Sequence, residues 1–247
     1  MALGTMPPGA LSASDAVVDR EQNSQRAYAR AAGLFYLLVL AFDIAGLVIT
    51  SSIEGAGDFG QTARNIVASQ GLYRIGLCLA LLGSMSTIPL AIGLYVTLKP
   101  VDGNLALTAL LFRAAEATVG AVGVVGAFAV LQIYLQASHA AGFDTDQLHA
   151  LIVLHPLGAS TDVAAIFFCV GSTIFFYVFL KTRYIPRILS AWGVFASVLY
   201  LAIWFTGLVA PGIPGLVQVL GSLPILIAEI STGLWLLIAG IQLQRPR

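Results

Sequence analysis

Residues 105–136 read LALTALLFRAAEATVGAVGVVGAFAVLQIYLQ, an apolar stretch interrupted by a single arginine and a single glutamate. A helix needs about 20 apolar residues to cross the hydrocarbon core of a bilayer. A strand of a membrane barrel would alternate apolar and polar residues, and this stretch shows no such alternation. It therefore predicts a transmembrane helix, and it raises the question of why two charged residues stand inside it.

The same apolar character recurs along the chain. Five further stretches are long enough to span a bilayer: 31–52, 71–98, 151–180, 187–209 and 217–242. The whole chain is 58% hydrophobic and 10% charged, whereas soluble domains carry about 25% charged residues. Helices are the default for such spans because lipid cannot satisfy an open backbone edge. We therefore expect an all-α fold, a polytopic transmembrane helical bundle of about six spans.

The chain before the first span differs in composition. Residues 1–27 are mostly small and polar and lack the apolar core of a secretory signal. We predict a flexible cytosolic tail over 1–27 and a single six-helix transmembrane domain over 28–247. The loop after the first span offers Asp58 as a cap for a short interfacial helix, with a plain connection as the alternative.

Basic residues are distributed unevenly between the two sides of the predicted membrane. Nine of the twelve share one side if both termini are on that side: Arg20, Arg26, Arg30, Lys99, Lys181, Arg183, Arg187, Arg245 and Arg247. Arg64 and Arg74 lie on the opposite side or at its border. Cytosolic loops are enriched in Lys and Arg, so we predict that both termini are cytosolic.

Several stretches together resemble a known family. In chain order they are RAYARAAGLFYLLVL (26–40), NIVASQGLYRIGL (65–77), LKPVDGNLAL (98–107), TRYIPRILSAWG (182–193) and AEISTGLWLLIAGI (228–241). The sequence resembles the bacterial six-helix membrane protein family catalogued as domain of unknown function 4386, over most of residues 26–242. The resemblance implies a multi-pass protein of the bacterial inner (plasma) membrane. It implies no catalytic residues, so the functional argument rests on the residues themselves.

Four carboxyl residues lie deep inside the predicted spans. They are Asp43, Glu116, Asp162 and Glu229. Each lies about 16–18 Å from the start of its span at 1.5 Å per residue, and the hydrocarbon core is about 30 Å thick. We therefore expect all four near the bilayer midplane, in a polar pocket between helices. A buried carboxyl without a counter-ion is disfavoured in its charged form, so we expect at least one to be protonated.

Three basic or titratable side chains accompany these acids. Arg113 precedes Glu116 by one helical turn and shares its helix face. His155 precedes Asp162 by about two turns. Arg74 lies near the outer end of the second span. Ionisable groups inside a membrane usually pair and mark functional sites, but each of these residues also has a purely structural reading, as a packing salt bridge, an interhelical hydrogen bond or a side chain reaching the head groups.

Three functions fit such a polar centre. The first, which we favour, is a protein that binds a small amphiphile or lipid or acts on it by acid–base chemistry. Its catalytic candidates are Glu116, Arg113, Glu229, Asp162 and His155. Its substrate-binding candidates are Arg113, Asp43 and Arg74. It predicts a pocket open sideways to lipid. The second, a proton-coupled carrier or channel, predicts a polar path to both sides. The third, a structural or regulatory subunit, predicts no cavity.

The sequence also narrows the chemistry. HExxH, CxxC and GxxxxGK[ST] motifs are absent from the sequence, so we expect neither a metal nor a cofactor. The formal net charge is zero, which gives no general attraction to nucleic acid. The predicted partners are membrane lipids and a small amphiphilic ligand.

Overall fold

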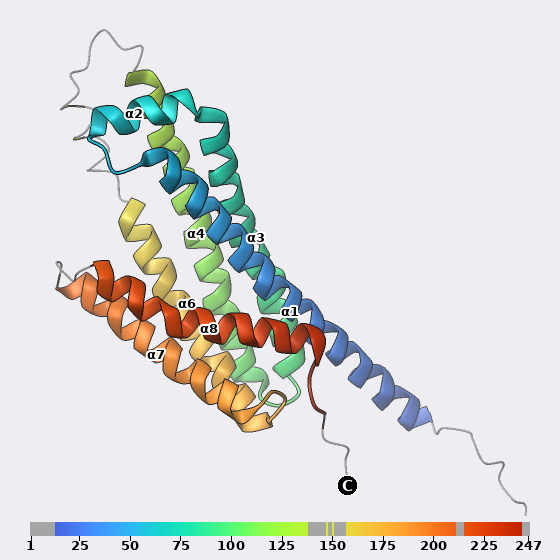
Figure 1. Cartoon of the computed structure of the whole chain (residues 1–247). Coiled ribbons are helices and arrows are strands. Elements are labelled where there is room, and N and C mark those ends of the chain that lie inside the picture. Colours follow the sequence, from blue (N-terminus) through green and yellow to red (C-terminus); the bar gives the residue numbers. More distant parts are fainter. Residues whose placement is uncertain (1–12, 138–146, 148–149, 151–156, 211–214, 244–247) are drawn as a thin grey trace, which may run out of the picture.

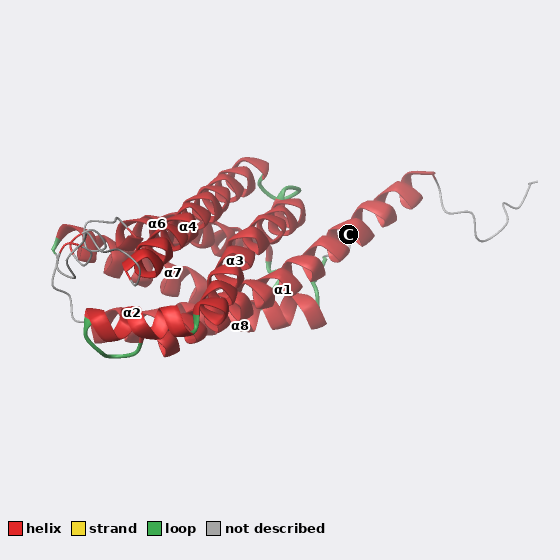
Figure 2. Ribbon diagram, turned by 90° about the horizontal axis from the view of Figure 1, so that it is seen from above, coloured by secondary structure: helices red, strands yellow, loops and turns green. Residues whose placement is uncertain are grey.

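The computed structural model describes residues 13–137, 147, 150, 157–210 and 215–243. Every element in these residues is a helix (Figure 2). The helices are α1 (Ala13–Glu54), α2 (Phe59–Ala68), α3 (Gln70–Leu98), α4 (Gly103–Ala137), α6 (Leu157–Thr182), α7 (Arg187–Val209) and α8 (Gly215–Ile238). Six of these, all but α2, are long and apolar enough to cross a membrane. The prediction of an all-α bundle with about six spans is confirmed.

The six spans form a ring. Each packs against its neighbours in chain order, from α1 through α3, α4, α6 and α7 to α8, and α8 packs back against α1. The closing contact depends on Gly33 and Gly233, since a Cβ on Gly33 would lie 2.7 Å from the Gly233 carbonyl oxygen. Small residues let spanning helices approach this closely. The helix α1 begins, and α8 ends, at the same end of the ring (Figure 1), which we call the terminal end; the opposite end, next to α2, is the far end.

The first helix begins earlier than the sequence predicted. We expected a flexible tail up to about residue 27, whereas α1 is helical from Ala13 and runs beyond the rest of the bundle (Figures 1 and 2). Gln25 helps to explain the difference, because its side chain is buried and donates a 2.6 Å hydrogen bond to the Thr97 carbonyl oxygen. Extending an existing helix adds one hydrogen bond for each residue ordered, so polar composition does not by itself end a helix.

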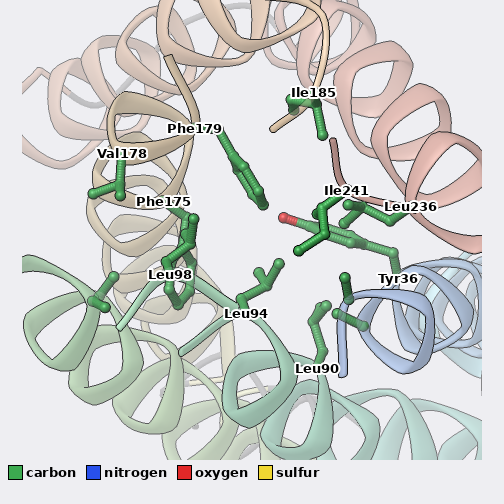
Figure 3. Close-up of a cluster of buried hydrophobic side chains, with 14 of the residues drawn as sticks. Tyr36, Leu90, Leu94, Leu98, Phe175, Val178, Phe179, Ile185, Leu236 and Ile241 are labelled. Carbon is green, nitrogen blue, oxygen red and sulfur yellow. The ribbon is translucent and has the colours of Figure 1, made fainter. Parts of the chain in front are cut away.

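A hydrophobic cluster fills the ring at the terminal end. Figure 3 shows its side chains converging from α1, α3, α6 and α8 and from the segment after α6. Leu94, Phe179 and Leu236 are fully buried there, at 0% exposure. Leucine and phenylalanine side chains have no polar atoms, so these residues make the interior of the terminal half largely apolar.

The helix α2 lies across the far end. Asp58 caps it by accepting a 2.7 Å hydrogen bond from the Gln61 backbone N–H. Ile66 is its fully buried residue and joins a second hydrophobic cluster with side chains of α1, α3 and α4. The predicted short helix after the first span is therefore confirmed, and it packs against the first three spans.

Candidate functional site

A cavity of about 330 Å³ lies inside the ring. Five spans line it: α1, α4, α6, α7 and α8. The lining runs from Arg113 of α4 and Glu229 of α8 to Ser222, near the far-end start of α8. The cavity therefore occupies the far half of the ring, and the apolar cluster occupies the terminal half.

Arg113 is the most buried polar side chain of the cavity. It is 1% exposed and extends from α4 toward α6. Its Nη1 donates a 3.3 Å hydrogen bond to the Ser172 hydroxyl, and its guanidinium carbon lies 4.8 Å from the centre of the Phe168 ring. Gly171 leaves room for the aliphatic part of the side chain, since a Cβ there would lie 3.0 Å from Arg113 Cγ. The interface between α4 and α6 is thus built around this arginine.

Arg113 and Glu116 form an ion pair within α4. Nη1 of Arg113 lies 3.0 Å from Oε2 of Glu116. The same Oε2 atom is buried without an aligned hydrogen-bond donor among the described residues. The contact is therefore an electrostatic attraction and not a well-directed hydrogen bond. Such a contact is weaker than the two-hydrogen-bond geometry in which arginine usually pairs with a carboxylate.

Glu229 approaches the same centre from α8. It is 6% exposed, and its Oε1 has no hydrogen-bond partner among the residues that the structure describes. Arg113 and Asp43 lie within electrostatic range of it. Nε of Arg113 is likewise buried without a partner in the described part of the chain. Buried polar atoms are nearly always paired with protein, water or a ligand, so these atoms need a partner beyond the side chains that the structure describes.

Asp43 lies at the edge of this centre. It lines the cavity from α1, is exposed on the surface of the described helices, and contacts Gly83 of α3, where a Cβ would clash with the carboxyl group. Asp43 therefore lies on the α3 side of α1 at the margin of the cavity. Figure 1 shows α1 and α8 diverging from their crossing near Gly33 and Gly233 toward the far end.

Aromatic side chains form the wall that sequence analysis missed. Phe168 of α6 stacks edge-to-face with Tyr200 of α7, with ring centres 6.2 Å apart, and Tyr200 does the same with Trp204 at 5.8 Å. All three rings line the cavity. The signal in the sequence is the spacing of Tyr200 and Trp204, which is one helical turn.

The remaining predicted site residues lie elsewhere or are not described. Asp162 is half-buried on α6 and is not among the cavity-lining residues, although its neighbour Thr161 is. Arg74 is half-buried near the start of α3, also outside the lining. His155 lies outside the described residues. The structure thus brings Asp43, Arg113, Glu116 and Glu229 to one cavity, and the roles assigned to all of these residues stay predictions.

Comparison with known proteins places the chain in a family. The sequence model described as Domain of unknown function (DUF4386) matches residues 31–240. The chain belongs to this family. The match confirms the resemblance found in the sequence, and it covers every residue that lines the cavity, from Val39 to Glu229. No curated protein and no solved structure matches the chain. This DUF4386 protein is therefore an integral membrane protein of six apolar helices, and its function has to be argued from the cavity.

Proposed function

We propose that this DUF4386 protein binds a small amphiphile or lipid. The polar head group enters the cavity beside Arg113, Glu116 and Glu229, and the apolar tail leaves between α1 and α8 into the bilayer. The observation that carries the proposal is the pair of unpartnered buried atoms, Arg113 Nε and Glu229 Oε1, beside a cavity of about 330 Å³. Ligand pockets commonly measure about 300–1,000 Å³ and combine apolar walls with a few polar groups.

The alternatives have less support. A carrier or channel needs a polar path through both halves of the ring, and the terminal half is filled by the apolar cluster around Leu94 and Phe179. A purely structural subunit needs no cavity, and its buried polar atoms would be expected to pair with one another. The divergence of α1 and α8 toward the far end favours access from the side over access through the protein.

Acid–base chemistry on the head group is a finer part of the proposal. A catalytic acid or base must come within hydrogen-bond reach of the proton that it transfers. Glu229 meets the requirement for a free acceptor atom, because its Oε1 has no partner in the described residues. Arg113, held by Glu116 and Ser172, would position the head group. We place the protein in the bacterial inner membrane, with its basic terminal end in the cytosol.

A fluorescence experiment tests the binding proposal. A variant that keeps only Trp204, with Trp192→Phe and Trp235→Phe, is reconstituted in lipid nanodiscs and titrated with amphiphiles whose tails carry bromine, a contact quencher. We expect saturable quenching, because Trp204 lines the cavity. Adding Ala165→Phe, which fills the cavity from α6, should abolish saturation. The matched control is Val163→Phe, on an exposed position of the same helix. Quenching that rises linearly and is equal in both variants would reject a binding site.

A further inference from the structure

We propose that the cavity selects a positively charged head group, an alkylammonium or a related organic cation attached to an apolar tail. This inference rests on the proposed function and names its ligand class. Its basis is the charge and the chemistry of the side chains that line the cavity.

The charge inventory of the cavity is unbalanced. Its lining includes three carboxyl groups, from Asp43, Glu116 and Glu229, and one cationic side chain, Arg113. The charge of Arg113 already has a carboxylate 3.0 Å away, the Ser172 hydroxyl at 3.3 Å and the Phe168 ring at 4.8 Å, although its Nε has no partner among the described residues. A second cation would therefore complete the pairing of the remaining carboxyl groups, whereas an anionic head group would have to approach Glu116 and Glu229 together.

Glu229 supplies the independent indication of a ligand. Acidic residues can cluster for structural reasons, but then each is expected to accept hydrogen bonds from its neighbours. Glu229 is 6% exposed and lines the cavity, and its Oε1 accepts no hydrogen bond from the described residues. An ammonium group in the cavity would give this oxygen a charge-assisted partner.

The aromatic wall fits an organic cation. Phe168, Tyr200 and Trp204 form a continuous edge-to-face series along one side of the cavity. Aromatic faces attract cations, and groups of such rings recognise quaternary ammonium ligands. The volume of about 330 Å³ exceeds that of a bare metal ion and leaves room for alkyl substituents and the first part of a tail. Charge, an unpaired acceptor and aromatic faces thus converge on one chemical class.

The test compares three amphiphiles that share a tail and differ in head-group charge. Octyltrimethylammonium, octyl glucoside and octyl sulfonate are each titrated, below their micelle-forming concentrations, into the full-length Trp192→Phe/Trp235→Phe protein in nanodiscs, and the fluorescence of its remaining tryptophan, Trp204, is followed. We expect the cation to bind most tightly. Glu229→Gln should weaken the cation by about 30-fold or more, the lower end of what loss of one partner of a buried charge pair costs. It should leave octyl glucoside unchanged.

Two further variants keep the test decisive. Glu54→Gln makes the same chemical change on α1 outside the cavity, where Glu54 accepts a 2.7 Å hydrogen bond from Tyr73, and it should not alter cation affinity. If Glu229→Gln does not fold, Asp43→Asn serves in its place, because Asp43 is exposed and also lines the cavity.

Each outcome separates the two proposals. Preference for the cation that is lost in Glu229→Gln supports the inference. Equal affinity for all three head groups, or tighter binding of octyl sulfonate, overturns the cation inference and leaves amphiphile binding standing. If none of the three amphiphiles shows saturable binding, both the cation inference and the amphiphile-binding proposal are overturned.

Discussion

Gly171 on α6 faces the side chain of Arg113 on α4, so closely that a Cβ at Gly171 would lie 3.0 Å from Arg113 Cγ and 3.1 Å from Cδ. The α4–α6 interface has adapted to a buried arginine by omitting a side chain opposite it. This relationship makes the arginine part of the packing as well as part of the cavity.

Substituting Gly171→Ala tests that packing. Both Gly171→Ala and the control Gly71→Ala gain about 1 kcal/mol of helix propensity, but a Cβ at Gly71 meets nothing within 4 Å. Overpacking costs about 1–3 kcal/mol. We therefore expect Gly171→Ala to be less stable than Gly71→Ala by about that amount, measured by thermal unfolding in detergent. Equal stability of the two variants would show that the interface tolerates the extra methyl group.

The Arg113–Glu116 pair is tested by a double-mutant cycle. Arg113→Met leaves Glu116 buried without its cation and should cost about 3–5 kcal/mol of unfolding free energy. The double variant Arg113→Met/Glu116→Leu removes both charges and should cost less than Arg113→Met alone, because replacing a whole buried pair by apolar side chains is often nearly neutral. Additive costs of the two single substitutions would mean that the residues do not act as a pair.

The extension of α1 depends on Gln25. Its side-chain amide donates to the Thr97 carbonyl at 2.6 Å and to the Tyr184 hydroxyl at 3.3 Å. Gln25→Ala should lose about 0.5–1.5 kcal/mol and should speed amide hydrogen exchange between residues 17 and 30. Gln22→Ala is the control, since exchange there should change little. Fast exchange in the unaltered protein would instead favour the flexible tail expected from composition.

Much of this fold could be predicted from the sequence. Apolar length gave six spans, and Asp58 with Ile66 gave the short helix α2. The helical start at Ala13 could not be predicted, because composition describes the polarity of residues 13–27 but not their long-range contacts, such as the one between Gln25 and Thr97.

The candidate site could be predicted only in part. Counting residues along each helix places Glu116 and Glu229 at similar depth, and both line one cavity in the structure. The direction in which each side chain points could not be predicted, because the spans are apolar on every face and show no periodicity that marks an inner side. For the same reason Asp162 was grouped with the cavity residues, while Tyr200 and Trp204 were not.

The central claim is that a cavity with a polar centre lies in the far half of the ring and that the apolar cluster fills the terminal half. Cysteine accessibility tests this claim most directly. In a protein with Cys78→Ala and Cys169→Ala, one cysteine is introduced at Ser222, which lines the cavity, or at Leu94, which is 0% exposed in the apolar cluster. A membrane-impermeant thiol reagent is then applied to each side of oriented vesicles, and a lipid-soluble thiol reagent is added to the bilayer in a parallel sample. We predict that Ser222→Cys reacts with the lipid-soluble reagent, more slowly with amphiphile present, and that Leu94→Cys reacts with neither reagent from either side. Reaction of Leu94→Cys from the terminal side, or an inert Ser222→Cys, would contradict the claim.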